Sequence, residues 1–384
     1  MRIVIAPDKF KGSLSAPEVA ESVAAGLHAA VGSSTILTIE QVPAADGGEG
    51  TLDAAVAAGF SLHITTVTGP TGEPLQAPIA IRDKQAVIEM ALASGLAVLP
   101  GGILDARGAT SQGTGDLIRF ALDRGCTDIV LGVGGSASTD GGAGVLAGLG
   151  VLLLDDDGRH LPPGGAALAS LARIDLTGLD PRLPAASITL ASDVDNPLLG
   201  PAGAAAVFGP QKGATNADIE ELDAALTHFV EVLAAAAGPG VAEMVTAQGA
   251  GAAGGVGYAA LAVLSARRRP GIDVVLELTG LAEKLSDADL VITGEGSLDE
   301  QSLGGKTPMG VASAASAANV RAIAVCGRTV LTPEQLVAAG FERTFALTDL
   351  EPDVELCIAN AATLLEQIGR EIAAHVGLMP GDAH

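Results

Sequence analysis

The sequence of 384 residues has few aromatic side chains: it contains no tryptophan and one tyrosine, and aromatic residues make up 2% of the chain. A core that depends on large rings is therefore excluded. Hydrophobic residues still account for 48% of the chain and are mostly Ala, Val, Leu and Ile, which is ample for a large core. Small side chains suit close packing of helices on sheets, and the chain length favours two domains.

Basic residues are also scarce. The chain has 21 Lys and Arg against 45 Asp and Glu, which gives a formal net charge of −24. Nucleic acids are bound by clustered Lys and Arg, and the only basic run, 267–269, is short, so a nucleic-acid partner is not expected. If the ligands are anionic, the site must gather its few lysines and its backbone N–H groups locally.

Cysteine usage excludes a disulfide framework and a zinc site. The three cysteines, Cys126, Cys326 and Cys357, are odd in number and form no C-x-x-C pair. We expect free thiols in a reducing compartment. The apolar N-terminal stretch is too short for a signal peptide, and the longest uncharged run, 247–266, is rich in Gly and Ala. These features predict a cytoplasmic protein with no membrane partner.

Short apolar runs alternate with helical patterns along much of the chain. Strands are predicted at 3–6, 35–42, 86–90, 128–132, 151–154, 188–191, 288–292, 321–326 and 343–347. Helices are predicted at 15–30, 143–149, 218–237, 257–266 and 274–285, from 308, from 333, and up to about 375. The first of them begins with Ser15-Ala16-Pro17-Glu18, which has the pattern of a capping box with proline in the first turn. Alternation of this kind indicates βαβ units and a parallel sheet.

These patterns predict an α/β fold of two domains. Residues 1–68 and 286–384 would form a discontinuous, Rossmann-like domain with a parallel sheet, because both chain ends alternate cleanly. Residues 69–285 would form an inserted α/β domain. A cleft between the two domains is the expected place for the active site.

The segment 293–307 is the most informative part of the sequence. It follows an apolar run and holds four glycines, with acids, hydroxyls and Lys306. Glycines let the backbone approach a ligand, and the free N–H groups of a helix beginning near Pro308 would point at an anion. The segment is not a P-loop, because Glu300 stands where that motif needs glycine. A phosphate site on another fold is favoured; a plain strand-to-helix turn with a solvated lysine is the alternative.

Two more polar loops follow the first two strands. Asp8, Lys9 and Lys11 come directly after residues 3–6, where open α/β sheets bind ligands. Asp46 and Glu49 lie among the glycines that follow the next strand. They are candidates for contact with Mg²⁺ or substrate hydroxyls. The alternatives are a polar turn for the first loop and a helix cap for the second.

The richest glycine loop spans 132–144 and contains Ser136, Thr139 and Asp140. It lies between a strand and a helix, and Asp155 follows at a distance of the kind seen in dinucleotide folds, so a Rossmann oxidoreductase is the second interpretation. The fingerprint is incomplete, because Ala137 occupies a position that needs glycine. The many hydroxyls fit a polyol or phosphate site better.

A further acidic loop, 191–200, follows the strand at 188–191. Asp193, Asp195 and Asn196 offer hard oxygen ligands for Mg²⁺, or one carboxylate accepts a proton from an attacking hydroxyl. An Asx-turn is the alternative. Lys212 lies in a glycine turn nearby in the sequence. Together, these loops supply the elements of phosphoryl transfer, which works by positioning and charge neutralisation.

These motifs, taken together, resemble the bacterial glycerate kinase family. The matching segments, in chain order, are D-x-F-K-G at 8–12, A-D-G-G-E-G at 45–50, G-T-G-D at 113–116, S-D-V-D-N-P-L at 192–198, F-G-P-Q-K-G at 208–213, G-A-A-G-G at 251–255 and T-G-E-G-S-L-D-E-Q-S at 293–302, with Gly305 and Lys306. They span nearly the whole chain. One departure is visible: Thr139 carries a hydroxyl where the family pattern has an amide.

The resemblance implies a two-domain α/β kinase that uses ATP and Mg²⁺ to phosphorylate D-glycerate, with 2-phosphoglycerate favoured as the product. A homo-oligomer is compatible with it. The alternatives are an NAD-dependent oxidoreductase of a small hydroxy acid and a non-catalytic hydroxy-acid binding protein.

Roles for individual residues follow from the resemblance. Asp193, Lys9 and Lys306 are expected to be catalytic, with Asp193 as the base or hydroxyl-orienting group. Substrate contacts are expected from Asp8, Lys11, Asp46, Glu49, Ser136, Thr139, Asp140, Asp195 and Asn196. ATP contacts are expected from Gly294, Gly296, Ser302, Gly304, Gly305 and Lys212. Metal contacts are expected from Asp299 and Asp195.

Overall fold

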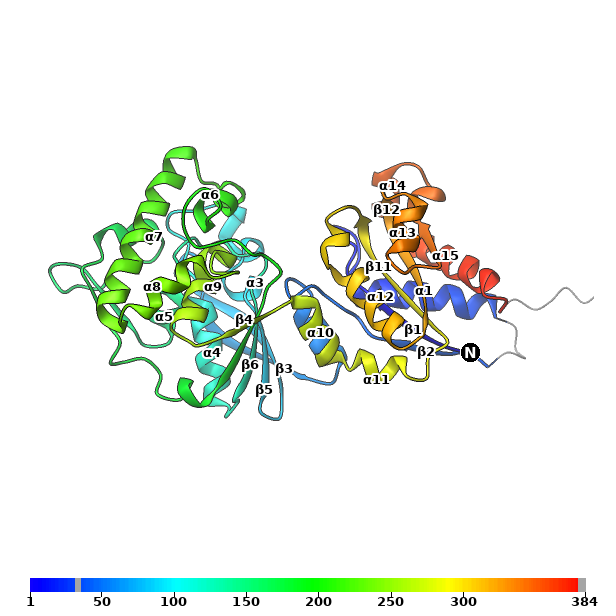
Figure 1. The fold of residues 1–384 in the computed structure, drawn as a ribbon, viewed down its shortest axis with the longest axis horizontal. Coiled ribbons are helices and arrows are strands. Elements are labelled where there is room, and N and C mark those ends of the chain that lie inside the picture. Colours follow the sequence, from blue (N-terminus) through cyan, green and yellow to red (C-terminus); the bar gives the residue numbers. More distant parts are fainter. Residues whose placement is uncertain (32–35, 379–384) are drawn as a thin grey trace, which may run out of the picture. The chain divides into compact units, whose positions relative to one another are not determined.

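The computed structural model describes residues 1–31 and 36–378 and divides them into two units (Figure 1). Of the described residues, unit 1 contains those within 1–46, 53–58 and 272–384, and unit 2 contains those within 47–52 and 59–271. Unit 1 is therefore assembled from both ends of the chain. Both units combine helices with a sheet that contains parallel strands, which confirms the predicted α/β class.

The sheet of unit 1 has five strands, all paired in parallel, in the order β13-β12-β11-β1-β2. Their bounds are β1 Arg2–Pro7, β2 Thr38–Gln41, β11 Leu290–Leu298, β12 Arg321–Thr329 and β13 Arg343–Ala346. The predicted strands of both chain ends lie in this sheet. The strand predicted over 35–42 is shorter, and Thr35 lies outside the described residues.

Both faces of this sheet are buried, which explains the continuous apolar runs. In β1, Ile3 and Ile5 belong to one hydrophobic cluster, whereas Val4 and Ala6 belong to another. The helices of the first cluster are α1 Ala16–Ala30, α14 Val354–Ala359 and α15 Ala361–His375. Those of the second are α11 Leu281–Leu285, α12 Thr307–Ala317 and α13 Pro333–Ala338. Parallel sheets covered on both faces read as unbroken hydrophobic strands.

The start of α1 was predicted from a capping box, and the structure confirms it. Ser15 is the N-cap with extended backbone, and Pro17 lies in the first turn. The Glu18 carboxylate accepts a hydrogen bond from the Ser15 main-chain N–H at 2.8 Å. This contact satisfies one of the donors that a helix N-terminus leaves unpaired.

The strand order of unit 1 reverses direction between β1 and β11. From β1 the chain passes to β2 on one side, whereas β11, β12 and β13 lie in succession on the other. Ligands of doubly wound sheets bind at such a switch point, outside the carboxyl ends of the strands. The loop after β1 carries Asp8 and Lys9, whereas the segment after Thr293 begins within β11 and continues beyond Leu298 into the turn before α12.

Unit 2 contains a six-stranded sheet in the order β10-β9-β6-β5-β4-β3. The bounds are β3 Ser61–Thr68, β4 Pro74–Arg82, β5 Gln85–Glu89, β6 Asp128–Gly132, β9 Ser187–Ala191 and β10 Arg267–Arg269. The strands from β10 to β5 pair in parallel, and β4 and β3 are antiparallel. A separate antiparallel pair is formed by β7 Leu152–Leu154 and β8 Arg173–Asp175.

The helices of unit 2 share one large hydrophobic cluster with this sheet. Leu117, Leu146, Phe229 and Val256 enter it from four of the helices. The bounds are α3 Ala91–Ser94, α4 Gln112–Asp123, α5 Ala143–Gly148, α6 Ala204–Phe208, α7 Asn216–Ala237, α8 Gly240–Glu243 and α9 Ala252–Ala262. Two further helices, α2 Thr51–Ala57 and α10 Gly271–Thr279, span the boundaries between the units.

Several elements of the middle of the chain differ from the predicted ones. The helix predicted over 274–285 is broken, because Gly280 adopts a left-handed conformation with φ of 65° between α10 and α11. The helix predicted over 257–266 corresponds to the part of α9 that follows its non-helical residues 253–255, and it ends earlier, at Ala262. The antiparallel strands β3 and β4 were not predicted, since their partly exposed residues form no continuous apolar run.

The division into units falls near, but not at, the expected boundaries. The strand β3, at 61–68, pairs with β4 and so lies in the sheet of unit 2. Residues 272–285 lie in unit 1, where Leu281 and Leu285 join the cluster formed with α12. Side-chain contacts set these limits. No pattern in the sequence marks them.

Two composition-based expectations can be compared with the structure. All three cysteines are buried and free. Among residues 1–31 and 36–378, no helix combines the length and apolar character that crossing a membrane requires.

We predict that Gly26→Ala destabilises unit 1. A Cβ at Gly26 would lie 2.0 Å from the Glu366 carbonyl oxygen, because α1 and α15 cross closely there. Alanine is favoured over glycine in a helix by about 1 kcal/mol, but overpacking costs about 1–3 kcal/mol and the obstacle is main chain. We expect a net loss of about 2 kcal/mol in urea unfolding.

The matched control is Gly240→Ala in α8, where a Cβ would meet nothing within 4 Å. This variant should be as stable as the wild type or more stable. A Gly26→Ala protein of unchanged stability would contradict the close crossing of α1 and α15.

Candidate active site

At the switch point of unit 1, the end of β1 lies beside the middle of β11. The main-chain N–H of Asp8 donates to the Gly294 carbonyl oxygen at 2.8 Å, and the Thr293 hydroxyl donates to the Ala6 carbonyl oxygen at 2.7 Å. Gly296 lies against the loop after β1, since a Cβ there would be 3.3 Å from the Lys11 nitrogen. Two loops that are far apart in the sequence therefore form one surface.

Asp8 lies at the centre of this surface and is held on both carboxylate oxygens. Its Oδ2 accepts a hydrogen bond from the Thr307 hydroxyl at 2.6 Å, and its Oδ1 accepts one from the Lys9 main-chain N–H at 2.7 Å. Burial and then the negative charge of Asp46 raise the pKa of Asp8 to about 7, although both hydrogen bonds oppose this. The carboxyl is thus poised to change charge near neutral pH.

A second carboxyl of this surface, Glu295, was not among the predicted site residues. Burial raises the pKa of Glu295, and the charges of Asp299 and Asp46 act in the same direction; the Ser302 hydroxyl and the Lys306 ammonium oppose the shift. Its Oε1 atom is buried and has no hydrogen-bond partner. A buried carboxylate oxygen without a donor is costly unless a ligand or cation completes it.

The segment after β11 forms the turn that leads into α12. Asp299 accepts hydrogen bonds from the main-chain N–H groups of Gln301 and Ser302 at 2.9 and 3.3 Å. Gly305 has a φ of 110°, which requires glycine, and Lys306 is the N-cap of α12. A Cβ at Gly304 or Gly305 would meet nothing within 4 Å, so this backbone borders open space.

Not every glycine of this segment serves a ligand. A Cβ at Gly294 would lie 1.8 Å from the Val325 carbonyl oxygen, so the sheet itself needs glycine there. Gly294 is also buried. The predicted contact of Gly294 with ATP stays a prediction, but the structure supplies a packing reason for this residue.

The glycine loop of unit 2 follows β6, and many hydrogen bonds hold it in place. Met90 and Leu96 donate their main-chain N–H groups to the Gly132 and Gly135 carbonyl oxygens, each at 2.9 Å. The Ala137 N–H donates to the Ser94 carbonyl oxygen at 2.9 Å. The loop is therefore rigidly attached to the segment that follows β5.

Three predicted ligand residues of this loop and its surroundings are fully buried. Thr139, Asp140 and Lys212 are at most 1% exposed. The Thr139 hydroxyl has no hydrogen-bond partner, whereas the Asp140 carboxylate and the Lys212 ammonium are held by protein atoms. Ser136, at 6%, is slightly more exposed than these three.

The acidic loop after β9 places its two carboxylates differently. The Asp193 Oδ1 accepts a hydrogen bond from the Gly271 main-chain N–H at 2.8 Å. Asp195 is exposed and forms an ion pair with Arg268 at 2.6 Å. The Asn196 side chain donates to the Ala202 carbonyl oxygen at 2.8 Å. Asp193 is also exposed.

Glu89 is another acid that the predicted site residues did not include. It lies at the end of β5 and is buried, and its Oε2 accepts hydrogen bonds from the main-chain N–H groups of Gly50 and Leu52 at 3.2 and 3.1 Å. It thereby fixes the loop that carries Glu49, which is exposed. No local pattern marks Glu89, because its partners lie 37 and 39 residues away.

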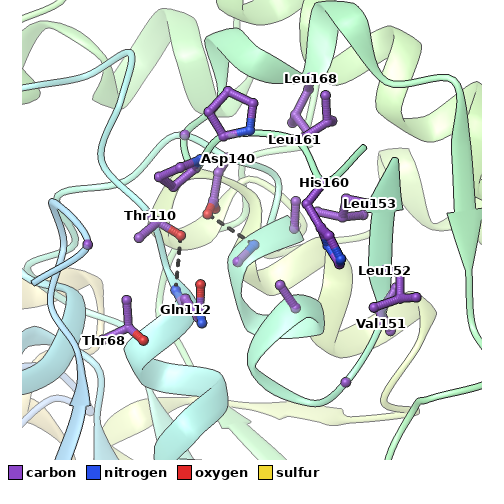
Figure 2. A pocket seen from close by; sticks show the side chains of 18 residues that line it. Thr68, Thr110, Gln112, Asp140, Val151, Leu152, Leu153, His160, Leu161 and Leu168 are labelled. Carbon is purple, nitrogen blue, oxygen red and sulfur yellow. Dashed lines mark hydrogen bonds between the residues drawn. The ribbon is translucent and has the colours of Figure 1, made fainter. Parts of the chain in front are cut away.

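A pocket of about 510 Å³ opens beside the glycine loop in unit 2 (Figure 2). Asp140, Thr110 and Gln112 line one side of it, and the hairpin residues Leu153 and Leu161 line another. Asp140 contributes a carboxylate whose oxygens are already hydrogen-bonded to protein donors. Asp140 therefore has little remaining capacity to accept hydrogen bonds from a ligand in the pocket.

The structure thus groups the predicted residues into two sets. Asp8, Lys9, Lys11, Asp46, Gly294, Gly296, Asp299, Ser302, Gly304, Gly305 and Lys306 lie in unit 1, and Glu49, Ser136, Thr139, Asp140, Asp193, Asp195, Asn196 and Lys212 lie in unit 2. The two predicted metal ligands, Asp299 and Asp195, fall in different sets. The predicted cleft between two domains stays a prediction.

Comparison with known proteins identifies the family. A family model described as "Glycerate kinase family" matches residues 3–377. The chain belongs to the glycerate kinase family. It is 46% identical over 382 residues to glycerate 2-kinase of Escherichia coli (strain K12), and 44% identical over 384 residues to glycerate kinase of Bacillus subtilis (strain 168), with 98% of both chains covered in each case.

A solved structure shares the fold. It is a crystal structure of a protein from Salmonella typhimurium LT2, named provisionally as glycerate kinase 2, with a TM-score of 0.84, 42% identity and coverage of 98% of both chains. The resemblance seen in the sequence motifs is therefore confirmed at the level of family and fold.

Family membership favours a kinase over the NAD-dependent alternative, and the fold gives a physical reason. Asp155 follows β7, which pairs antiparallel with β8 in the separate hairpin and not with β6. Asp155 accepts hydrogen bonds from the main-chain N–H groups of Asp157 and Arg159 at 3.0 and 2.8 Å, so it stabilises a turn. A dinucleotide fold would need this acid at the end of a neighbouring parallel strand.

We predict that Asp8→Asn changes stability in a pH-dependent way. The folded-state pKa of Asp8, about 7, lies above the ordinary aspartate value of 3.8, so the folded protein binds more protons between these values and loses stability as the pH rises through them. Asparagine removes this loss. Relative to wild type, Asp8→Asn should therefore become more stable between pH 4.5 and pH 8, as measured by urea unfolding.

A stability difference that stays constant across this pH range would show that Asp8 titrates normally. Glu73→Gln serves as the control, because Glu73 is an exposed acid that accepts a hydrogen bond from the Thr71 hydroxyl at 2.6 Å. Its stability difference from wild type should not acquire the same dependence near neutral pH.

Proposed function

We propose that this protein transfers the γ-phosphoryl group of ATP to the 2-hydroxyl of D-glycerate, giving 2-phosphoglycerate and ADP. Membership of the glycerate kinase family supports the reaction class, and the similarity to a relative named glycerate 2-kinase favours the 2-hydroxyl. One observation carries the proposal furthest. A glycine-containing turn, the N-terminus of α12 and perturbed carboxyls meet at the switch point of unit 1, where Asp8 and Glu295 lie beside the turn that leads to Lys306.

The donor set at this switch point fits a Mg²⁺ ion. Glu295 and Asp299 are hard oxygen donors, the negative charges of Asp299 and Asp46 both act on Glu295, and the Glu295 Oε1 atom lacks a partner. Within the described ranges, no group of three or more His, Cys, Asp or Glu could hold a metal ion. Mg²⁺ usually takes one or two carboxylates and fills its other positions with water and phosphate oxygens.

When bound, Mg²⁺ neutralises the charge that develops on the transferred phosphoryl group. In our proposal two carboxylates, Glu295 and the predicted ligand Asp299, hold the cation. Asp195 is less suited to this task, because Arg268 already pairs with it.

The triphosphate is proposed to bind at the N-terminus of α12. The helix has 11 residues, and its first N–H groups and dipole favour an anion. Gly304 and Gly305 allow close approach of the backbone, and Lys306 adds a positive charge at the N-cap. Lys9 and Lys11 lie on the neighbouring loop after β1 and would supply the other cations.

Asp193 is proposed to orient the glycerate hydroxyl and accept its proton. The hydroxyl oxygen then forms a bond to the γ-phosphorus, and the bond from that phosphorus to the bridging oxygen breaks, so the electron pair leaves with ADP. The hydrogen bond from Gly271 fixes the Asp193 side chain at one oxygen. Ser136 and Asn196 are proposed to contact the hydroxyl and carboxylate groups of glycerate.

The proposed reaction predicts ADP release from purified protein that depends on D-glycerate. The assay contains ATP and Mg²⁺, with L-glycerate and no-acceptor controls, and phosphorus NMR of the same mixture assigns the phosphorylated hydroxyl. ADP formed with neither enantiomer would contradict the proposal. A 3-phosphoglycerate product would contradict the choice of hydroxyl alone.

We predict that Asp193→Asn lowers kcat by about 10²–10⁴-fold, the usual contribution of a positioned general base. Asparagine keeps the shape and can still accept the hydrogen bond from Gly271, so the fold should persist. The kcat is measured alongside the thermal unfolding midpoint.

Asp157→Asn is the control for this experiment. Asp157 lies in an exposed turn of unit 2, where it pairs with Arg159 at 2.7 Å. It should retain wild-type turnover. Near-normal kcat for Asp193→Asn would remove Asp193 from the mechanism.

A further inference from the structure

Two opposite charges are completely buried in unit 2. Lys212 is 0% exposed and Asp140 is 1% exposed, in a protein where most charged residues remain in contact with water. Removing such groups from water costs several kcal/mol for each ion unless partners compensate. Their place in the fold is equally specific, because Asp140 belongs to the glycine loop and Lys212 bonds to the same loop.

Asp140 fixes the second half of the glycine loop. Its carboxylate accepts main-chain hydrogen bonds from Gly142 and Gly144 at 3.0 and 3.2 Å, and from Ser111 at 2.8 Å. The Ser111 hydroxyl donates to the same carboxylate at 2.8 Å. Burial raises the pKa of Asp140, but these four donors all favour the ionised form. The loop is thereby joined to the segment that precedes α4.

Lys212 holds the same loop at Ser138. Its ammonium group donates to the Ser138 carbonyl oxygen, and a Cβ at Gly254 would lie 2.8 Å from the Lys212 Nζ atom. Burial lowers the pKa of Lys212 to about 7, and the negative charge of Asp140 opposes this shift. The lysine is therefore enclosed by the loop and by the start of α9.

The backbone that lies next to the Lys212 ammonium group adopts an unusual conformation. Ala253, Gly254 and Gly255 have φ values of 53°, 67° and 95° in succession. The first is a non-glycine residue in the left-handed region, which costs on the order of 1 kcal/mol and persists only where the surroundings dictate it. The Gly254 carbonyl oxygen in turn accepts a hydrogen bond from the Gly141 N–H at 2.9 Å.

We propose that Lys212 and Asp140 are positioning residues, a buried charge pair that fixes 138–144 and so presents the loop to the phosphoryl acceptor. This inference rests on the proposed function. It differs from the direct contacts with ATP and substrate expected for these two side chains, because Lys212 is 0% exposed and the Asp140 oxygens already accept hydrogen bonds from protein donors. Ser136 lies in the preceding part of the loop, and the rigid attachment would hold it in position for its proposed contact with glycerate.

The test is Lys212→Met, which keeps the length and volume of the side chain and removes the charge. A misplaced binding group can cost about 10²-fold in rate, so we expect kcat/KM for glycerate to fall by about ten- to a hundredfold, mainly through KM, with the KM for ATP within twofold. A general loss of folded protein would change neither KM. Unchanged glycerate kinetics in folded Lys212→Met protein would overturn the proposal.

The matched control is Lys84→Met, at an exposed lysine in the turn between β4 and β5 of the same unit. Its kinetics should equal those of the wild type.

A double-mutant cycle with Asp140→Asn tests whether the two charges act as a pair. Each single substitution leaves one buried charge without its opposite, whereas the double variant leaves neither. We expect the loss of kcat/KM in the double variant to be smaller than the product of the two single losses. Losses that multiply would show two independent residues.

Hydrogen exchange provides a measurement that does not depend on the reaction. Peptides covering 136–144 should exchange faster in Lys212→Met than in wild type, while peptides from β5 and β6 keep their protection. Equal exchange over 136–144 would overturn the positioning role. If the wild-type protein fails to phosphorylate glycerate, the proposed function falls, and this exchange comparison still decides the structural part.

Discussion

The parallel pairing of β1 with β11 is the contact on which the candidate site depends. It joins residues 287 positions apart, as the bond between the Thr293 hydroxyl and the Ala6 carbonyl oxygen shows. Because both faces of this sheet are covered, the strands are apolar and polar side chains can gather only beyond their ends. The pairing therefore sets Asp8 beside the turn before α12 and gathers the polar residues of the candidate site at that edge of the sheet.

Burial has opposite consequences for the fold and for the charges it encloses. It stabilises the apolar clusters, yet it raises the pKa of Asp8 and Glu295 and lowers that of Lys212. In unit 1 the perturbed groups, Asp8 and Glu295, are both acids that feel the negative charge of Asp46, so a bound cation would relieve repulsion between carboxylates. In unit 2 the buried charges have opposite signs and are hydrogen-bonded to one loop, which makes them suited to fixing geometry rather than to binding a ligand.

Glycine serves two different purposes in these loops. At Gly304 and Gly305 the backbone borders open space, as a phosphate site requires. At Gly294 and Gly254 a Cβ would collide with a carbonyl oxygen at 1.8 and 2.0 Å, so glycine is needed for packing. A glycine-rich sequence indicates close backbone approach in both cases and does not say what approaches.

Local patterns in the sequence determined the parallel α/β class, the capping box at Ser15, the strands of the unit 1 sheet, three of the six strands of the larger unit 2 sheet and the family resemblance, because each depends on neighbouring residues or on a contiguous motif. They also located the polar loops at the strand ends. They did not reveal Glu295 or Glu89 as site residues, since the meaning of these acids comes from burial and from distant partners.

Tertiary structure alone decided how each polar residue is used. Lys212 and Asp140 read as ligand contacts in the sequence, but the fold buries both. Asp155 reads as a dinucleotide acid, but its strand pairs in a separate hairpin. The physical reason is the same in each case: a residue type and its spacing fix which bonds a side chain can make, whereas solvent access and non-local neighbours fix which of those bonds it does make.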